Sequence, residues 1–410
     1  MAQANYLVGL DIGSSAVRVV VGKIEEEGKE PSIIGVSETP SSGIRKGVIV
    51  DIDEAVSTIS SALEKVERMT GVPVSRAVVA IGGSHISSID SHGVIAVSRA
   101  DGEITENDII RVIDASQAIS IPQNREIIHV IPKNFTVDGQ AGIKDPLGMT
   151  GIRLEVDTVI VQAAAPFIKN LQKAIAQAGL QIDDMVLAPL AASQAALSKR
   201  QKELGVALID MGGGTTSLVV FEEGDLLHTA IVPVGSAHIT NDIAIGLRTS
   251  IETAEKVKLE YAHAIPRQVP RTEEIDLSKI DPAEEEKASR HHLAEITEAR
   301  IEEIFELINA ELKKINRYGQ LPAGAVLTGA GAKMPGVMDL AKKQLKLPVQ
   351  IGVPANVRTV IDRVEDPAFA TAVGLVLWAH EYMHRKGGAS QMFNGKFFDR
   401  FRKVFKKFLP

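Results

Sequence analysis

One short pattern occurs twice in this sequence, about 200 residues apart. In each copy an apolar run ends in an aspartate, Asp11 or Asp210, and a turn of small residues then leads into a second apolar run. Such runs are typical of buried strands, and the small residues between them indicate a tight turn. Solenoid repeats recur every 20 to 50 residues. The longer spacing here therefore predicts two similar α/β halves.

Other segments extend this two-part plan. Apolar residues recur at helical spacing from Ile52 to Val66, which predicts a helix that ends at Gly71. Residues 84–162 contain short β-prone runs and a helix opened by a capping box at Thr105–Asp108, so they indicate a small inserted α+β subdomain. Residues 265–292 are rich in Pro and charge and predict an exposed loop.

Composition excludes several classes of protein. The chain has no Cys, which rules out disulfides, thiolate nucleophiles and thiolate zinc sites and suits a reducing compartment. The first residues carry no basic region and no run of 18 apolar residues occurs, so neither a signal peptide nor a spanning helix is predicted. A net charge of −7 and only 4% aromatic residues disfavour nucleic acid as a partner.

The two small-residue turns are candidate phosphate-binding loops. Backbone N–H groups in such turns can point at an anion, glycines permit close approach, and hydroxyls can donate hydrogen bonds. The candidate residues are Asp11, Gly13, Ser14 and Ser15 in the first loop and Asp210, Gly212, Gly213, Gly214, Thr215 and Thr216 in the second. Either turn alone could be a plain hairpin, and neither is a Walker loop, but together they could clamp a polyphosphate. Asp11 and Asp210 could hold Mg²⁺ through water.

Two further groups could complete a nucleotide site. A third turn with Gly329, Ala330, Gly331 and Lys333 could cradle an adenosine. Glu255 and Lys258 stand three residues apart in a predicted helix and could clasp ribose and base. They could equally form a surface ion pair worth a few tenths of a kcal/mol.

These motifs resemble the actin-like ATPase superfamily, which includes heat-shock chaperones and sugar kinases. The resemblance implies a duplicated, two-lobed α/β fold that holds ATP or ADP with Mg²⁺ in the cleft. Residues 84–162, with His129–Pro132 and Gly142–Gly151, resemble the inserted subdomain of the FtsA family of bacterial division proteins.

That resemblance implies a subdomain plan. Subdomain 1A would comprise residues 1–83, 163–195 and about 360–385, and subdomain 1C residues 84–162. Subdomain 2A would comprise residues 196–225 and about 306–359, and subdomain 2B residues 226–305. A linker at 386–395 and an amphipathic helix at 396–410 would follow.

Three positions depart from the superfamily's catalytic pattern. Ala16 stands where many members carry a phosphate-contacting Lys, Ala188 where related ATPases carry Glu or Gln, and Ser217 where chaperones carry Asp. Loss of a base or water-orienting group costs about 10²- to 10⁴-fold in rate. We therefore expect nucleotide binding with weak or absent ATPase activity, and no catalytic residue is assigned.

The last residues predict a membrane-binding helix. Residues 396–410 carry six basic residues and one acidic residue, and apolar residues recur at helical spacing with the basic residues largely on the other face. A helix of this kind can lie in the surface of a membrane of anionic lipids. A helix docked on the body or a calmodulin-target-like helix is the alternative. The candidate membrane contacts are Phe397, Phe398, Arg400, Phe401, Lys403, Val404, Phe405, Lys407 and Phe408.

The resemblance also implies a function. Members of the FtsA family polymerise at the division site on the cytoplasmic face of the inner membrane, tether FtsZ filaments there and help recruit later division proteins. The FtsZ tail would bind subdomain 2B, with Arg300 as a carboxylate contact and Glu303 as a weaker one. Two alternatives share the core fold: a PilM-like scaffold for pilus assembly and a sugar or acid kinase.

Overall fold

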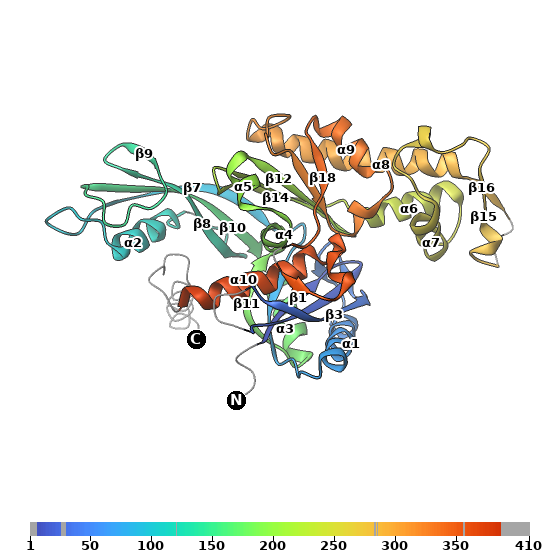
Figure 1. Cartoon of the computed structure of the whole chain (residues 1–410), viewed down its shortest axis with the longest axis horizontal. Coiled ribbons are helices and arrows are strands. Elements are labelled where there is room, and N and C mark those ends of the chain that lie inside the picture. Colours follow the sequence, from blue (N-terminus) through green and yellow to red (C-terminus); the bar gives the residue numbers. More distant parts are fainter. Residues whose placement is uncertain are drawn as a thin grey trace.

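The computed structural model describes residues 6–25, 30–119, 121–282, 284, 286–355 and 357–386. The linker predicted at 386–395, apart from Lys386, and the amphipathic helix predicted at 396–410 lie outside these residues. Within them the chain forms two lobes at the centre and an arm at either side (Figure 1).

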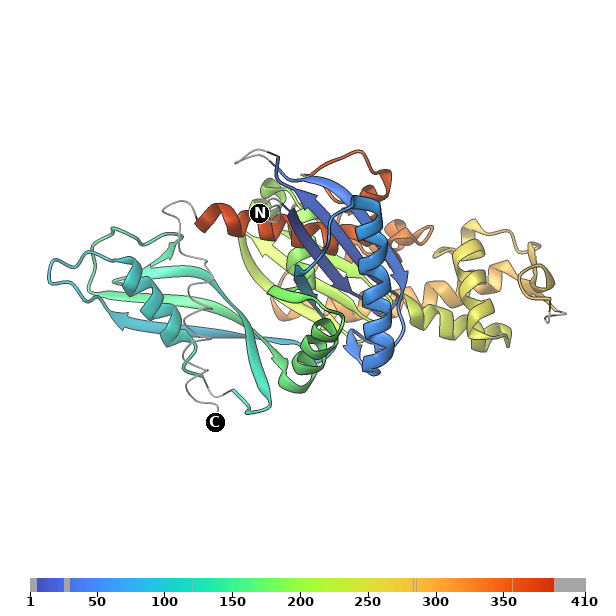
Figure 2. The same cartoon turned by 90° about the horizontal axis from the view of Figure 1, so that it is seen from below.

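Lobe 1 is a six-stranded sheet in the order β11-β6-β1-β2-β3-β19. Helices α1 and α3 pack on one face through Ile59, Val66 and Ile175, and α10 packs on the other face through Val373 and Val376 (Figure 2). Helix α1 begins where the Asp51 side chain accepts a hydrogen bond from the Glu54 N–H and ends at Gly71 in the left-handed conformation. The strands are β1 (Tyr6–Ile12), β2 (Ala16–Lys23), β3 (Ser32–Pro40), β6 (Arg76–Ile81), β11 (Gln181–Leu187) and β19 (Arg358–Thr359), and the helices are α1 (Ile52–Thr70), α3 (Ala165–Gln177) and α10 (Ala370–Lys386).

Lobe 2 repeats this plan in a five-stranded sheet of order β14-β13-β12-β17-β18. Helices α8 and α9 cover one face, and α4 packs against the other in a core that Ile81 and Leu187 of lobe 1 share with Leu208 of lobe 2. The strands are β12 (Val206–Met211), β13 (Thr216–Glu222), β14 (Asp225–Val232), β17 (Ala325–Thr328) and β18 (Val349–Ile351), and the helices are α4 (Ala188–Ala196), α5 (Lys199–Leu204), α8 (Arg290–Lys314) and α9 (Val337–Leu345).

The strand register shows the duplication directly. The hairpin β1–β2 pairs Asp11 with Arg18, and the hairpin β12–β13 pairs Asp210 with Ser217. On its other side, β1 runs parallel to β6, and β12 runs parallel to β17. The predicted two-part α/β fold is therefore correct.

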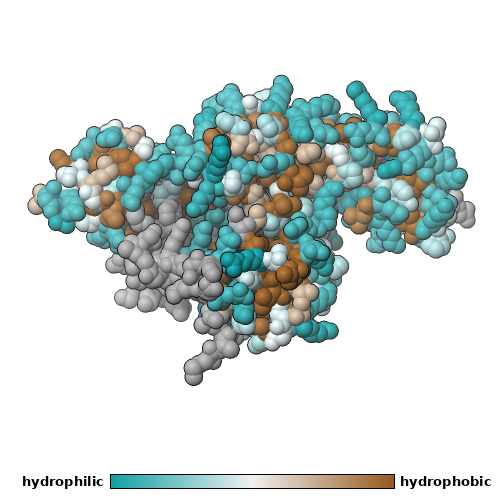
Figure 3. Space-filling view, in the orientation of Figure 1, coloured by the Kyte–Doolittle hydropathy of each residue, from teal (hydrophilic) through white to brown (hydrophobic). Residues whose placement is uncertain are grey.

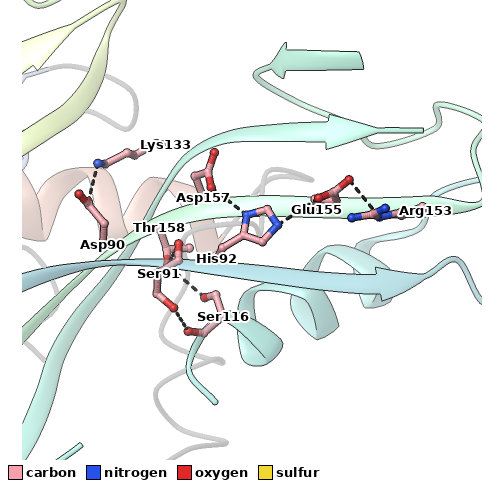
Figure 4. A network of polar contacts seen from close by, with 9 residues as sticks. All are labelled: Asp90, Ser91, His92, Ser116, Lys133, Arg153, Glu155, Asp157 and Thr158. Carbon is pink, nitrogen blue, oxygen red and sulfur yellow. Dashed lines mark hydrogen bonds and ion pairs between the residues drawn. The ribbon is translucent and has the colours of Figure 1, made fainter. Parts of the chain in front are cut away.

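One arm is an antiparallel sheet of order β7-β10-β8-β9 with α2 on one face, where Ile109, Val112 and Leu154 form a separate core. On the sheet, His92 lies between Asp157 (2.8 Å from Nδ1) and Glu155 (3.0 Å from Nε2), and the hydrogen bond with Asp157 raises the pKa of His92 (Figure 4). The elements are β7 (Ser87–Ala96), α2 (Glu106–Ser116), β8 (Arg125–Val137), β9 (Gln140–Ile143) and β10 (Arg153–Ala164).

This arm is inserted in lobe 1 but also contacts lobe 2. The Ser88 hydroxyl donates to the Thr229 carbonyl oxygen at 2.7 Å, and Lys144 forms an ion pair with Asp225. Both partners in lobe 2 lie on β14.

The other arm packs α6 (Ser236–Leu247) and α7 (Ile251–Tyr261) against the first half of α8. The exposed loop predicted at 265–292 is wrong in part, because β15 (Glu274–Asp276) and β16 (Lys287–Ser289) pair there. Ile275, Leu277 and Ala288 are buried and anchor this segment to the helices. Apolar residues show over the central body, whereas hydrophilic residues cover much of both arms (Figure 3). No helix in the described part of the chain is long and apolar enough to cross a membrane.

Candidate phosphate-binding cleft

The two small-residue turns face each other across a cleft of about 710 Å³, part of which is open to solvent. Each turn closes in the same way: the Gly13 N–H donates to the Ala16 carbonyl at 3.1 Å, and the Gly212 N–H donates to the Thr215 carbonyl at 3.0 Å. Eleven of the predicted residues line the cleft: Asp11, Gly13, Ser14, Ser15, Asp210, Gly212, Gly213, Gly214, Thr215, Gly329 and Ala330.

The loops are in direct contact, which explains the glycines of the second loop. A Cβ atom on Gly213 would lie 2.9 Å from the Ser15 Cβ, and one on Gly214 would lie 2.7 Å from the Ser14 Oγ. Ordinary side chains at these two positions would push the lobes apart. The close approach leaves the serine hydroxyls of the first loop at the interface of the lobes.

Three predicted residues of the turns do not line the cleft. Thr216 is buried, and its hydroxyl donates to the Val234 carbonyl at 2.8 Å. Gly331 packs against the Met211 side chain, and the Lys333 ammonium lies 2.5 Å from an Asp366 carboxylate oxygen.

Glu255 and Lys258 lie near the second loop but outside the cleft lining. The Lys258 ammonium is 2.6 Å from the Glu255 carboxylate and 2.8 Å from the Thr240 hydroxyl. It also lies 3.4 Å from the carbonyl oxygen of Ser236, whose own N–H donates to Gly212. The pair is thus an ion pair that joins α7 to α6 beside the second phosphate loop.

The two aspartates line the cleft and are half-buried. Burial raises the pKa of Asp11 to about 7, against the opposing effect of Arg18, and the neighbouring Asp210 raises it further. Burial also raises the pKa of Asp210, whose carboxylate accepts a 3.4 Å hydrogen bond from Thr371. The raised pKa values of these two acids indicate that no nearby positive charge is large enough to keep both ionised. A hydrated Mg²⁺ would supply that charge, so the residues fit the predicted metal.

Arg18 is a cleft residue that the sequence reasoning missed. Its guanidinium donates to Glu38 at 2.7 Å and lies over the Phe369 ring, while its buried Nε has no hydrogen-bond partner among the described residues. A buried donor without an acceptor is rare and costly, so this atom fits an anionic ligand. A signal was present, because Arg18 is the one charged residue between Asp11 and Lys23.

The three residues that depart from the catalytic pattern, Ala16, Ala188 and Ser217, all lie in or beside the cleft. Ala16 is buried at the start of β2, and Arg18 lies two residues further along the same strand. Ala188 and Ser217 both line the cleft, and neither can act as a carboxylate base.

Arg300 and Glu303 lie on α8 in the helical arm, away from the cleft. Arg300 forms a forked ion pair with Asp242 on α6, at 2.5 and 2.8 Å, and a further ion pair with Glu303. A carboxylate ligand would therefore compete with Asp242 for this guanidinium.

Fold and cleft together place the protein in the class of actin-like ATPase folds. The solved PilM–PilN type IV pilus biogenesis complex matches with a TM-score of 0.67 and 16% identity over 91% of this chain and 98% of that chain. MreB5 of Spiroplasma citri bound to ADP matches with a TM-score of 0.55 and 14% identity, over 93% of this chain and 98% of that chain. At these identities the likeness concerns the fold alone.

Sequence comparisons define the family. A model described as "Cell division protein FtsA" matches residues 207–374, and "SHS2 domain inserted in FTSA" matches residues 83–162. The FtsA of Bacillus subtilis is 43% identical over 91% of this chain and 83% of its own length. The FtsA of Pseudomonas aeruginosa is 39% identical over 91% of this chain and 88% of its own length. The chain belongs to the FtsA family of cell division proteins.

Proposed function

We propose that this protein binds Mg-ATP or Mg-ADP, polymerises on the cytoplasmic face of the inner membrane at the division site and tethers FtsZ filaments there. The observation that carries the nucleotide part is the cleft in which two glycine loops meet beside Asp11, Asp210 and an Arg18 Nε that has no hydrogen-bond partner among the described residues. Backbone N–H groups and the serine hydroxyls would bind the phosphates, and Asp11 and Asp210 would hold Mg²⁺ through water. Family membership supports the role in division.

The tether is argued from sequence. Residues 396–410 carry the basic and phenylalanine-rich pattern, and the family resemblance implies an anchor at this position. Subdomain 2B, with Arg300 and Glu303, is the proposed site for the FtsZ tail, and the remaining partners are other copies of the chain and later division proteins. A tail that binds at Arg300 has to displace or share Asp242.

We expect slow phosphate release from Mg-ATP. Ala188 has no polar side-chain atom and the Ser217 hydroxyl is too weak a base to deprotonate a water molecule, which lowers the rate by about 10²- to 10⁴-fold relative to an ATPase with a base there. Single-turnover measurement of phosphate release, alone and with polymers formed, tests this. Rapid turnover in either condition would show that another residue provides the missing base.

Co-sedimentation of FtsZ polymers with anionic liposomes in Mg-ATP tests the tether. The full chain is expected to bring FtsZ into the liposome pellet, and a chain that ends at Asn394 is expected to lose this activity. A matched control keeps the full length but replaces Phe401 and Phe405 with Ser, which removes apolar contacts and leaves the charge unchanged. If the full chain leaves FtsZ and the liposomes apart, the tethering role is wrong.

A PilM-like scaffold is the second candidate, because the PilM–PilN complex shares the fold over most of both chains. It predicts that the protein binds liposomes while FtsZ stays in solution. The kinase alternative has no support from the cleft, which offers no substrate-side base at Ala188 or Ser217.

A further inference from the structure

A short hairpin closes over the two phosphate loops. It consists of β4 (Ile44–Arg45) and β5 (Val48–Ile49), with Lys46 and Gly47 at its tip. The Gly47 N–H donates to the Ser14 hydroxyl oxygen at 2.8 Å, and Gly47 lines the cleft. The Lys46 Cα lies 2.9 Å from the place where a Cβ on Gly214 would stand. The tip therefore contacts loops of both lobes.

The conformation of the tip is tightly fixed. Lys46 and Gly47 both have positive φ, at 49° and 74°. A Cβ atom on Gly47 would lie 2.6 Å from the Gly83 Cα, so only glycine fits there. The Lys46 carbonyl oxygen also accepts a hydrogen bond from the Ser84 N–H at 3.4 Å. A tip held on three sides fixes the backbone from which the Lys46 side chain extends, next to Gly47 in the cleft lining.

The contact with Gly47 also prepares Ser14 for a ligand. Because the Ser14 oxygen accepts the Gly47 N–H, its own hydroxyl hydrogen is free to donate. The natural acceptor in the cleft is a phosphate oxygen. The hairpin tip and the first loop thus act on the same part of a ligand.

Lys46 differs from the other cations around the cleft. Arg18 pairs with Glu38, Lys258 with Glu255, and Lys333 with Asp366. Lys46 is exposed and forms no ion pair or hydrogen bond through its ammonium with any residue that the structure describes. A lysine ammonium is a compact charge on a flexible four-carbon stem, and it binds phosphate well.

We propose that Lys46 binds the terminal phosphate of a nucleoside triphosphate and so discriminates triphosphate from diphosphate. The inference rests on the proposed nucleotide binding. The predicted adenosine turn packs against Asp210 and Met211, whereas Lys46 packs against Gly214. A nucleotide with its adenosine at that turn presents its phosphates to the loops that Lys46 contacts. A triphosphate then bridges the hairpin of lobe 1 and the loop of lobe 2.

Affinities for ATP and ADP, measured with Mg²⁺ by titration of fluorescent analogues, test this proposal. Lys46→Gln is expected to weaken ATP binding by about 10- to 100-fold, the value of one charged hydrogen bond, and ADP binding by less than about threefold. Arg45→Gln removes the neighbouring exposed charge of the same hairpin and is expected to preserve the ratio of the two affinities. Lys46→Arg is expected to restore most of the preference for ATP.

The outcomes separate this inference from the function on which it rests. An equal loss for both nucleotides, or no loss for either, overturns the role of Lys46 while nucleotide binding stands. If the unchanged protein binds neither nucleotide, the proposed function fails as well. Thermal unfolding of each variant without nucleotide shows whether a loss of binding reflects a loss of folded protein.

Discussion

Asp11→Asn is expected to stabilise the nucleotide-free protein at pH 8 and to reduce the dependence of its stability on pH. The pKa of Asp11 is about 7 in the folded protein, against 3.8 for a free aspartate, because the surrounding residues remove much of the water from its carboxyl group. The folded state therefore holds this proton more tightly than the unfolded state does. The resulting stability is fully present below pH 3.8 and is lost as the pH rises through 7.

The size of the effect follows from the shift. One pKa unit corresponds to about 1.4 kcal/mol, so ionising Asp11 destabilises the folded state by roughly 4 kcal/mol between low pH and pH 8. Asparagine has no charge to lose. Urea unfolding at several pH values from 5 to 8 is expected to give curves for the two proteins that diverge as the pH rises.

Asp339→Asn provides the matched control, because Asp339 is exposed on α9 and pairs only with Lys342 among the described residues. The free energy of unfolding of Asp339→Asn is expected to change with pH in the same way as that of the unchanged protein. If the unfolding free energies of Asp11→Asn and the unchanged protein changed equally with pH, ionisation of Asp11 would not destabilise the folded state. Mg-ATP is expected to stabilise the unchanged protein more than the Asn variant, because a divalent cation interacts with a carboxylate more strongly than with an amide.

Gly374→Ala is expected to destabilise the protein by about 3 kcal/mol, the upper part of the range for overpacking. Alanine in a helix is normally about 1 kcal/mol better than glycine, so helix propensity alone predicts the opposite sign. The contact decides the outcome: a Cβ on Gly374 would overlap the carbonyl oxygen of Ala191 on α4. Backbone atoms cannot rotate away, so α10 and α4 would have to separate.

Gly82→Ala is the control, because its Cβ would meet nothing closer than the Ala188 Cβ at 3.8 Å and its φ is not positive. Midpoints of thermal and urea unfolding give the comparison. A Gly374→Ala protein as stable as the Gly82→Ala protein would mean that the two helices can shift apart at little cost.

The architecture was predictable because its signals are local. The aspartate and small-residue turns of β1–β2 and β12–β13 each lie within a dozen residues of sequence, and finding one makes the other easy to recognise. The capping box at Thr105 and Asp108 is local for the same reason, and α2 begins there. The glycine turn after β17 lies beside Asp210 because Asp210 is near the end of β12, which runs parallel to β17.

What could not be predicted depends on partners that are distant in sequence. The contact of Arg18 with Glu38 depends on a third strand, β3, where Glu38 lies 20 residues further along the chain. Arg300 has Glu303 at helical spacing, but its forked partner Asp242 is 58 residues away on another helix. The pairing of β15 with β16 depends on the burial of Ile275 and Ala288 in the core of the helical arm. The charged and proline-rich sequence of this segment does not indicate that burial.

The contacts between the inserted arm and β14 have a mechanical consequence. The arm is continuous in sequence with lobe 1, but Ser88 and Lys144 hold it to Thr229 and Asp225 of lobe 2. Widening the cleft must therefore either break these two bonds or bend the arm where it leaves lobe 1. Substitutions at Lys144 or Asp225 are accordingly expected to loosen the contact between the arm and lobe 2 without altering any residue that lines the cleft. The arm thus forms a second connection between the lobes, made by residues outside the cleft lining.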